Sequence, residues 1–489
     1  MAFTPPPAFT TRPTLQGTFG MSASTHWLAT ASAQAVLERG GNAFDAAAAG
    51  AFVLHVVEPH LNGPGGDLVA LFATADDPTP VVLSGQGPAP AGATREHYLA
   101  EGLELVPGSG ALAAAVPGAV DAWLLLLKDH GTWELADVLA FAVGYAEGGH
   151  PVLERVCATI ARVAPLFTEH WPTSAERWMP GGRIPEPGEL IFDPAYARVL
   201  RGLVAAGDGA ASREERIEAA RTEWATGFVA QAAEAFVRTP HRHSDGGDHA
   251  GVIAASDFAG YRASYEPAVT LEFRGHTIAK TAAWSQGPAL LATLAILDGL
   301  DDDRLDPSTE LGAHTVLEAQ KLAYADRDAY FGDDDVPLGT LLSPAYAAER
   351  RALIGERAAA EFRPGVLPGR ESFTPPLRTA YTPPSGVAAE GVGEPTVLRT
   401  GETRGDTLPH RRRGPLGQHR LGDAVRRLAA VVPDHPRAGL LPRHPPADDL
   451  AGGGLRVDSH ARPPPPHDAD ADPGAARRRA GDRTRLPRR

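Results

Sequence analysis

The chain has 489 residues, 43% hydrophobic and 22% charged, which predicts a globular protein large enough to bury a substantial core. Its single cysteine, Cys157, excludes an intramolecular disulfide and a cysteine-based zinc site. The sequence has no apolar run long enough to cross a membrane, and its start lacks the cationic head and apolar stretch of a signal peptide. We therefore expect a soluble, cytoplasmic protein that does not contact a membrane.

The net charge of −14 is unevenly distributed along the chain. Residues 408–489 contain 17 Arg and no Lys against 9 Asp and no Glu, a net charge of +8 that leaves −22 for residues 1–407. This segment also has no Phe, Tyr or Trp, and such a composition buries too little apolar surface to offset the entropy lost on ordering. We expect the folded part to end near Thr407 and the Arg/Pro-rich tail to be disordered.

Helix and strand patterns alternate before that boundary. Residues 26–39 have helical spacing and end at Gly40, where glycine allows a left-handed cap. Asn42 can cap a second helix, with Asp45 in its favourable first turn. Residues 62–67 (NGPGGD) predict a tight turn, and residues 68–73 predict a strand.

The same reading continues toward the middle of the chain. Helices are predicted over residues 123–128, 135–146 and 289–297, and in the run that reaches Tyr330. Two β-rich runs, 269–273 and 277–279, flank an Arg-Gly-His turn and predict a hairpin. Together these elements predict an α+β protein.

Residue types alone support no familiar catalytic or metal site. The 63–67 turn lacks the Lys-Ser/Thr ending of a phosphate-binding loop, so a structural or oxyanion-lining turn is favoured. The aspartates around Tyr330 lack the glycine and glutamate of a calcium loop and favour a solvated helix end. There is no G-x-S-x-G motif. Structural roles are also favoured for Cys157 and for four scattered histidines: His26, His55, His60 and His314.

Several motifs, taken in order, resemble the large subunit of gamma-glutamyltransferases, which are N-terminal-nucleophile enzymes made as self-cleaving precursors. Their order and spacing over roughly 400 residues carry the resemblance. The motifs are residues 40–47 (GGNAFDAA), 63–67 (GPGGD), 88–90 (PAP) with 93–95 (ATR), 117–118 (PG), 256–261 (SDFAGY), 324–327 (YADR) and the junction 405–407 (GDT).

The resemblance implies a four-layer αββα sandwich, with residues 1–406 as large subunit and residues 407–489 in the place of the small one. It implies gamma-glutamyl transfer, or hydrolysis of glutathione-like donors, without a metal or organic cofactor. Intact relatives would be heterodimers of the two cleaved subunits acting on small molecules. We expect no nucleic-acid partner, because no aromatic residue or nucleic-acid motif accompanies the basic tail.

The chemistry explains why the junction needs a threonine. The Thr407 hydroxyl would attack the carbonyl of Asp406, and hydrolysis of the resulting ester would cut the chain between these residues. The freed α-amine, with a reference pKa of about 8, can then act as the base for the hydroxyl of the same residue. Asp406 and Thr407 are therefore the predicted autocleavage site, and Thr407 is the predicted catalytic nucleophile.

Two features depart from the family pattern. The family's donor-binding arginine corresponds to Gln86, whose amide offers no charge and no bidentate contact to a carboxylate. An acyl amide, as used by cephalosporin-acylase-like members, therefore remains open as the substrate. After Thr407, Pro409 and the arginines 411–413 replace the expected buried strand.

A one-base shift in reading frame accounts for the second departure. Synonymous codons exist for residues 408–432 that, read one base later, encode Cys-His-Ile-Asp-Val-Val-Asp-Arg-Trp-Gly-Asn, which resembles the family's small-subunit opening. Residues 461–472 can recover another family-like stretch in the same frame. We therefore interpret the tail as out of frame and expect little activity from the chain as written. A non-catalytic large-subunit remnant is the alternative.

Overall fold

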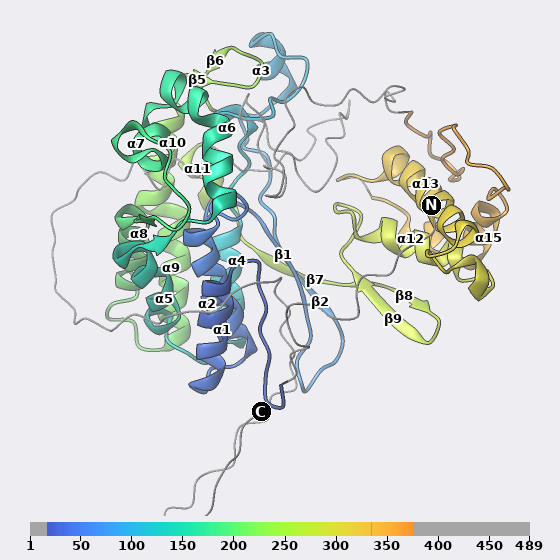
Figure 1. Ribbon diagram of the computed structural model, residues 1–489, viewed down its shortest axis with the longest axis horizontal. Coiled ribbons are helices and arrows are strands. Elements are labelled where there is room, and N and C mark those ends of the chain that lie inside the picture. Colours follow the sequence, from blue (N-terminus) through green and yellow to red (C-terminus); the bar gives the residue numbers. More distant parts are fainter. Residues whose placement is uncertain (1–16, 334, 375–489) are drawn as a thin grey trace, which may run out of the picture.

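The computed structural model describes residues 17–333 and 335–374. Helices gather at two opposite sides of the molecule, and short strands lie between them (Figure 1). The first side carries helices from α1 to α11, and the second carries α12, α13 and α15. The helices are α1 (Trp27–Glu38), α2 (Ala43–Val57), α3 (Arg95–Ala100), α4 (Ala119–His130), α5 (Leu135–Gly148), α6 (Glu154–His170), α7 (Pro172–Trp178), α8 (Pro194–Ala205), α9 (Arg213–Thr226), α10 (Phe228–Val237), α11 (Ala255–Gly260), α12 (Gly287–Leu297), α13 (Glu310–Tyr330), α14 (Leu338–Leu341) and α15 (Pro344–Arg351).

The strands are short, and all of their pairings are antiparallel. The central sheet has the order β1-β2-β7, and each of the other three sheets in the described residues has two strands. The strands are β1 (Leu68–Phe72), β2 (Val81–Gly85), β3 (His150–Pro151), β4 (Leu190–Ile191), β5 (His241–Arg242), β6 (Asp248–His249), β7 (Ser264–Pro267), β8 (Val269–Phe273) and β9 (His276–Lys280).

The first two helices begin as the sequence predicts. His26 caps α1, its Nδ1 accepting the N–H of Leu28 at 3.1 Å. Gly40 follows α1 with φ of +90°, a conformation that glycine adopts without a steric cost. The side chain of Asn42 accepts the N–H groups of Phe44 and Asp45, while the carboxylate of Asp45 accepts the N–H of Asn42, forming a capping box.

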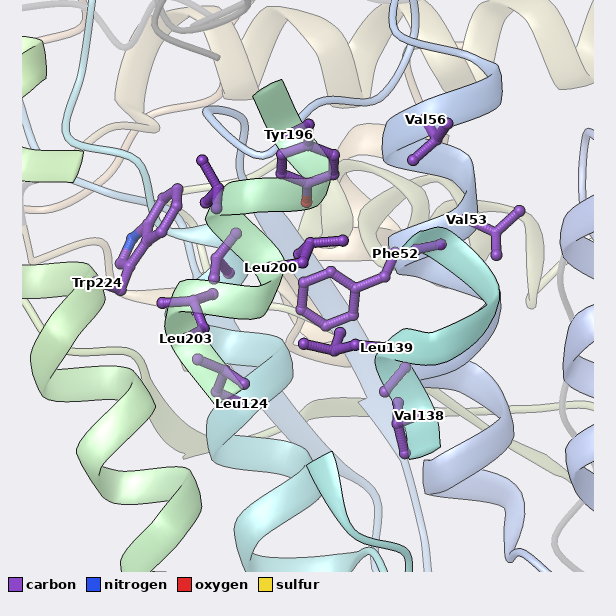
Figure 2. Close-up of a cluster of buried hydrophobic side chains, with 14 of the residues drawn as sticks. Phe52, Val53, Val56, Leu124, Val138, Leu139, Tyr196, Leu200, Leu203 and Trp224 are labelled. Atoms are coloured by element: carbon purple, nitrogen blue, oxygen red, sulfur yellow. The ribbon is translucent and has the colours of Figure 1, made fainter. Parts of the chain in front are cut away.

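A large apolar core joins helices of the first side. Figure 2 shows Phe52 and Val53 of α2 beside Val138 and Leu139 of α5. Side chains of α8 and α9 close the same cluster, and Leu200 is fully buried. Each fully buried side chain of this size contributes roughly 2 kcal/mol to folding, so this cluster anchors the whole helical side.

One face of the central sheet packs on α4. Leu83 of β2 is buried against Ala122 and Leu125 of that helix, and Leu68 of β1 joins them. Val69 and Leu71 alternate with these residues on β1 and are 44% and 40% exposed. The sheet therefore has one face covered by helix and one that points toward the second side of the molecule.

The second side begins with the predicted hairpin. Strands β8 and β9 are joined by Arg274 and Gly275, which have φ of 49° and 79° and so form a tight two-residue turn. Helices α12 and α13 follow as predicted, although α13 already starts at Glu310. The indole N–H of Trp284, just before α12, donates to the carboxylate of Glu266 on β7 at 2.8 Å. This bond ties the second side to the central sheet.

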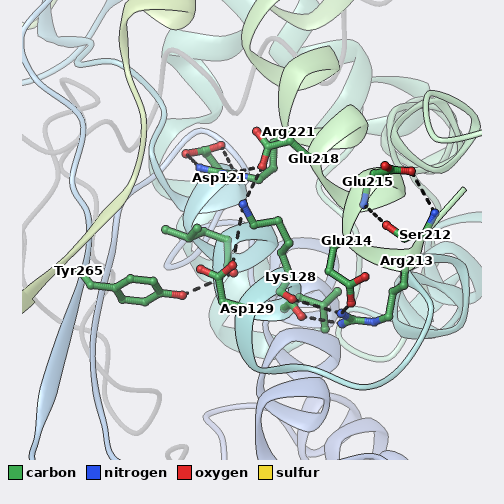
Figure 3. Close-up of polar contacts among 12 residues, drawn as sticks. Asp121, Lys128, Asp129, Ser212, Arg213, Glu214, Glu215, Glu218, Arg221 and Tyr265 are labelled. Carbon is green, nitrogen blue, oxygen red and sulfur yellow. Dashed lines mark hydrogen bonds and ion pairs between the residues drawn. The ribbon is translucent and has the colours of Figure 1, made fainter. Parts of the chain in front are cut away.

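A buried ion pair holds α4 against α9. Arg221 donates from Nε and Nη2 to the two carboxylate oxygens of Asp121 at 2.9 and 3.0 Å, and both side chains are nearly inaccessible (Figure 3). Asp121 also accepts the N–H of Ala263 at 2.7 Å, which places the start of β7. The pair thus links two helices and a strand that are far apart in the sequence.

Candidate functional site

The predicted binding residue Gln86 lies immediately after the central strand of the β1-β2-β7 sheet. Its predecessor Gly85 faces α4, since a Cβ built there would lie 2.5 Å from the Cβ of Ala122. Successive residues of an extended chain point to opposite faces. Gln86, which is half-buried, is therefore directed to the sheet face that looks toward the second side of the molecule.

Two glycines allow backbone segments to meet at this end of the sheet. A Cβ on Gly87 would lie 1.7 Å from the carbonyl oxygen of Val116, and one on Gly118 would lie 2.0 Å from that of Gly85. No larger residue fits at either position without moving the backbone. These contacts explain the Pro117-Gly118 motif, which sets the start of α4 against the end of β2.

The Gly-rich turn of residues 63–67 completes this junction. The N–H of Gly66 donates to the carbonyl of Gly63 at 2.9 Å, which confirms the predicted tight turn. The carbonyl of Gly66 in turn accepts the N–H groups of Gly118 and Ala119 at 3.1 and 3.0 Å. The chain then enters β1 through Asp67. The turn, the start of α4 and the end of β2 therefore form one rigid unit around Gln86.

Tyr261 adds a buried hydroxyl to the same junction. A Cβ on Gly118 would lie 2.8 Å from the Tyr261 hydroxyl oxygen, and this atom has no hydrogen-bond partner among the described residues. Burial raises the pKa of Tyr261, and the nearby carboxylates of Asp121 and Asp67 raise it further. The hydroxyl is therefore neutral at physiological pH and keeps its proton available for donation.

The structure places Gln86 but not its predicted catalytic partners. Asp406 and Thr407 lie outside the described residues, as does the tail of residues 408–489. Their roles, the expected disorder of the tail and the division of the chain at residue 406 stay predictions.

The 40–47 motif is structural rather than catalytic. Asp45 is fully buried, and its carboxylate accepts hydrogen bonds from the backbone of Thr132 and Trp133 and from the Thr132 hydroxyl, at 2.7 to 3.1 Å. Together with its bond to Asn42, this carboxylate fastens α2 to the loop between α4 and α5. The 40–47 motif therefore has a structural role, which is to attach α2 to the loop between α4 and α5.

The predicted solvated helix end around Tyr330 is wrong for Asp326. This carboxylate is only 2% exposed, pairs with the Nε of Arg350 at 3.2 Å and accepts the N–H of Gly365 at 2.6 Å. Burial raises the pKa of Asp326, which the Arg350 charge partly opposes. The next residue of the motif, Arg327, donates to the side-chain oxygen of Gln286 at 2.8 Å. The 324–327 motif therefore joins α13 to α15 and to the start of α12.

Three of the four histidines and the cysteine have structural surroundings. Burial lowers the pKa of His26 to about 4 and that of His55 to about 3, so both rings are neutral. His55 contacts the Tyr196 hydroxyl at 3.0 Å, and His314 contacts the carbonyl of Gly355 at 2.8 Å. Cys157 is buried on α6, and burial raises its pKa, which disfavours the reactive thiolate.

Sequence reasoning missed two residues of the junction. Asp67 was treated only as part of a turn, and Tyr261 only as part of a motif. Local sequence patterns do not predict that these two residues lie at the junction. Their positions depend on the pairing of β2 with β1 and with β7, which follows α11. Within residues 17–333 and 335–374, no group of three or more His, Cys, Asp or Glu side chains is placed to hold a metal ion. No helix in the described part is long and apolar enough to span a bilayer.

The fold and the sequence motifs indicate an enzyme family, and comparison with known proteins identifies that family. The gamma-glutamyltranspeptidase family model matches residues 29–383. The chain therefore belongs to the gamma-glutamyltranspeptidase family.

Three known proteins are similar to this chain in sequence or in structure. The glutathione hydrolase-like YwrD proenzyme of Bacillus subtilis is 33% identical over 353 residues, which cover 71% of this chain and 62% of that protein. A solved structure of LmbA2991, in a threonine-to-alanine variant, is 51% identical, with a TM-score of 0.74 over 81% of this chain and 66% of that one. The cephalosporin acylase of Bacillus halodurans is 32% identical, with a TM-score of 0.63 over 74% and 65%.

These likenesses confirm the predicted fold class, and the enzyme names agree with the predicted family of activities. The chain spans just under two thirds of the length of the YwrD relative and of the acylase.

Proposed function

We propose that the intact protein is a self-processing amide hydrolase or transferase, which moves a gamma-glutamyl or related acyl group from a small donor to water or an amino acid. The observation that carries this proposal is the family match over residues 29–383, followed by a Gly-Asp-Thr junction at residues 405–407. In this proposal Thr407 is the nucleophile, and cleavage yields a heterodimer of large and small subunits.

The proposed processing step uses groups of the chain and water alone. The Thr407 hydroxyl adds to the carbonyl carbon of Asp406, and the C–N bond breaks as the acyl group moves to oxygen. Water then hydrolyses the ester, which leaves a carboxylic acid on Asp406 and a free amine on Thr407. That amine takes the hydroxyl proton when the donor's amide carbonyl is attacked, and it returns the proton to the departing amine.

Gln86 is our candidate for the donor-binding residue. Its place at the rigid junction of β2, α4 and the 63–67 turn supports this role, because such a site holds a side chain in one orientation. An amide at this position binds a carboxylate less strongly than an arginine would. An acyl amide therefore remains the second candidate donor, and the likeness to a cephalosporin acylase favours it.

The proposal includes a frame correction after Thr407. As written, the segment after Thr407 has Pro409 and three consecutive arginines where a buried strand is expected, and we propose that this chain has little activity. Reading the gene around the Thr407 codon tests the correction. A tail whose alternate frame encodes no family-like sequence would overturn it. The cytoplasmic location stays a prediction.

The function is tested with the frame-corrected gene. Purified protein should resolve as two chains on a denaturing gel, and it should release p-nitroaniline from γ-glutamyl-p-nitroanilide or an acyl product from an acyl-cephalosporin. The two substrates distinguish the two candidate donors. A cleaved protein that turns over neither substrate would contradict the proposed activity. An intact chain would support a non-catalytic remnant.

A further inference from the structure

The chain contains two asparagines, and the structure gives their side chains opposite surroundings. The side chain of Asn42 is held by three hydrogen bonds at the start of α2. Its Oδ1 accepts the N–H groups of Phe44 and Asp45 at 2.9 and 3.0 Å, and its Nδ2 donates to the carbonyl of His130 at 2.6 Å. Asn62 is half-buried in the loop between α2 and β1, and its side-chain amide has no hydrogen-bond partner among the described residues. The Asn62 amide can therefore rotate, whereas that of Asn42 is fixed.

The residues that follow the two asparagines differ in the same sense. Asn62 is followed by Gly63, whose N–H donates to no acceptor in the described part of the chain. Glycine has no Cβ, so nothing on Gly63 itself crowds its backbone nitrogen. Asn42 is followed by Ala43, which has a Cβ and is the first residue of α2. The Gly63 nitrogen is therefore the more accessible of the two to the preceding side chain.

We propose that Asn62 is a modification site, at which the side-chain amide is lost by spontaneous deamidation. The backbone nitrogen of Gly63 attacks the side-chain carbonyl carbon of Asn62, a C–N bond forms, and the Cγ–Nδ2 bond breaks. The displaced nitrogen leaves as ammonia with the proton that the Gly63 nitrogen gives up. Water then opens the resulting cyclic imide at either carbonyl, which gives aspartate or isoaspartate. The reaction consumes one water molecule and releases one ammonia, and it needs no part of the proposed amidase activity.

The modification alters the connection from α2 to the rigid 63–67 turn. The N–H groups of Leu61 and Asn62 both donate to the carbonyl of Glu58, at 3.0 and 2.9 Å, and the turn begins immediately after them. In isoaspartate the main chain runs through the former side chain and is one carbon longer, so these bonds and those of the turn cannot all keep their geometry. Either product also places a new carboxylate near the negative, C-terminal end of the α2 dipole. We expect the modified protein to unfold at a lower temperature than the fresh protein.

Peptide mapping by mass spectrometry tests the site on the purified full-length protein. Chymotrypsin separates the two asparagines, because Phe44 and Phe52 lie between them. After incubation at pH 8, the Asn62 peptide should gain the mass of an amide-to-acid exchange at least about tenfold faster than the Asn42 peptide, since Asn42 must first break its hydrogen bonds. Conversion of Asn62 should be slower at pH 6, because the attacking nitrogen must lose its proton.

The same protein in guanidinium chloride gives the reference rates, because neither asparagine then has tertiary contacts. Unfolding should accelerate conversion of Asn42 by about tenfold or more and that of Asn62 by much less, since a loop opens at little cost in free energy. An Asn62 that converts in denaturant but stays intact in the folded protein would overturn the proposal. Equal rates for Asn62 and Asn42 in the folded protein would overturn it as well.

Asn62→Gln is the matched control for the effect on stability, because it keeps an amide but closes the corresponding larger ring far more slowly. Its melting temperature should be the same before and after incubation at pH 8, whereas that of the parent protein should fall by about 2 °C or more. A parent protein whose Asn62 is fully converted without any change in melting temperature would overturn the effect on the turn.

Discussion

The imidazole Nδ1 of His249 lies 2.8 Å from the Oε2 of Glu101, and its Nε2 lies 3.1 Å from the Oδ2 of Asp245. A neutral imidazole has a single N–H, so both ring nitrogens can donate to carboxylates only when the ring is protonated. Burial opposes the charged ring, but the hydrogen bonds to the two carboxylates outweigh it and raise the pKa of His249. The protonated ring thus joins the end of α3 to the β5–β6 hairpin.

The cluster of His249, Glu101 and Asp245, here called the His249 clasp, predicts that the free energy of unfolding depends on pH. A raised folded-state pKa gives stability that is present below the unfolded pKa and is lost as the pH rises through the folded pKa. The hydrogen bond from His249 lowers the pKa of Glu101, so the clasp also weakens at strongly acidic pH, where that carboxylate is protonated. His249→Gln should therefore reduce the free energy of unfolding by about 1 kcal/mol more at pH 6 than at pH 8.

Urea unfolding at the two pH values measures this difference. His276→Gln, the same change at an exposed histidine of β9, serves as the control and should show no such dependence. The ring centroid of the neighbouring His243 is 5.1 Å from that of His249. Its Nε2 accepts the N–H of Leu112, and His243 is kept in both variants. Equal losses for His249→Gln at both pH values would show that the ring is not charged in the clasp.

Removal of the Asp45 carboxylate should destabilise the helical side. Asp45→Ala leaves four donors without their acceptor: the N–H groups of Asn42, Thr132 and Trp133 and the Thr132 hydroxyl. We expect a loss of about 3 kcal/mol in the free energy of unfolding, since buried donors pay their full desolvation cost. Chemical denaturation measures it, and Asp76→Ala at an exposed position is the control. A loss below about 0.5 kcal/mol, the scale of an ordinary surface change, would contradict this role.

Breaking the Asp121–Arg221 pair should cost more than replacing it. Asp121→Ala removes the buried partner of the Arg221 guanidinium and leaves it only the more exposed carboxylate of Glu218, so we expect a loss of about 3 kcal/mol. The double variant Asp121→Leu with Arg221→Met removes both charges and should recover part of that loss. A double variant less stable than Asp121→Ala would indicate that the remaining pair of Arg221 with Glu218 contributes more than the imbalance of buried charge costs.

Two glycine-to-alanine changes should have opposite signs. Gly87→Ala places a methyl group against the carbonyl of Val116 and should lower the melting temperature and reduce processing. Gly144→Ala lies within α5 with no atom near its Cβ position, and it should stabilise the protein by about 0.5 to 1 kcal/mol through helix propensity. Differential scanning calorimetry of both variants tests the pair. Stabilisation by Gly87→Ala would disprove the close backbone contact.

Local signals in the sequence predicted much of the fold. The caps at Gly40 and Asn42 and the Arg274-Gly275 turn were found because each depends on neighbouring residues. Strands β2 and β7 were missed, because their pairing joins residues about 180 positions apart. The helices between residues 194 and 237 were also missed, and the very polar α9 shows little of the apolar periodicity on which the prediction relied.

The site was only partly predictable for the same reason. Gln86 came from a resemblance to a family motif, whereas the position of Asp67 near it became visible only through the β1–β2 register. Asp45 was expected to favour the start of α2, but its bonds to residues 132 and 133 require the tertiary fold.

N-terminal sequencing of the smaller chain produced by the frame-corrected protein tests the central proposal most directly. Self-cleavage should give a chain that begins with Thr407, and Thr407→Ala should remain a single intact chain without amidase activity. A corrected protein that stays uncut, or a Thr407→Ala variant that is still cleaved and active, would contradict the proposed nucleophile.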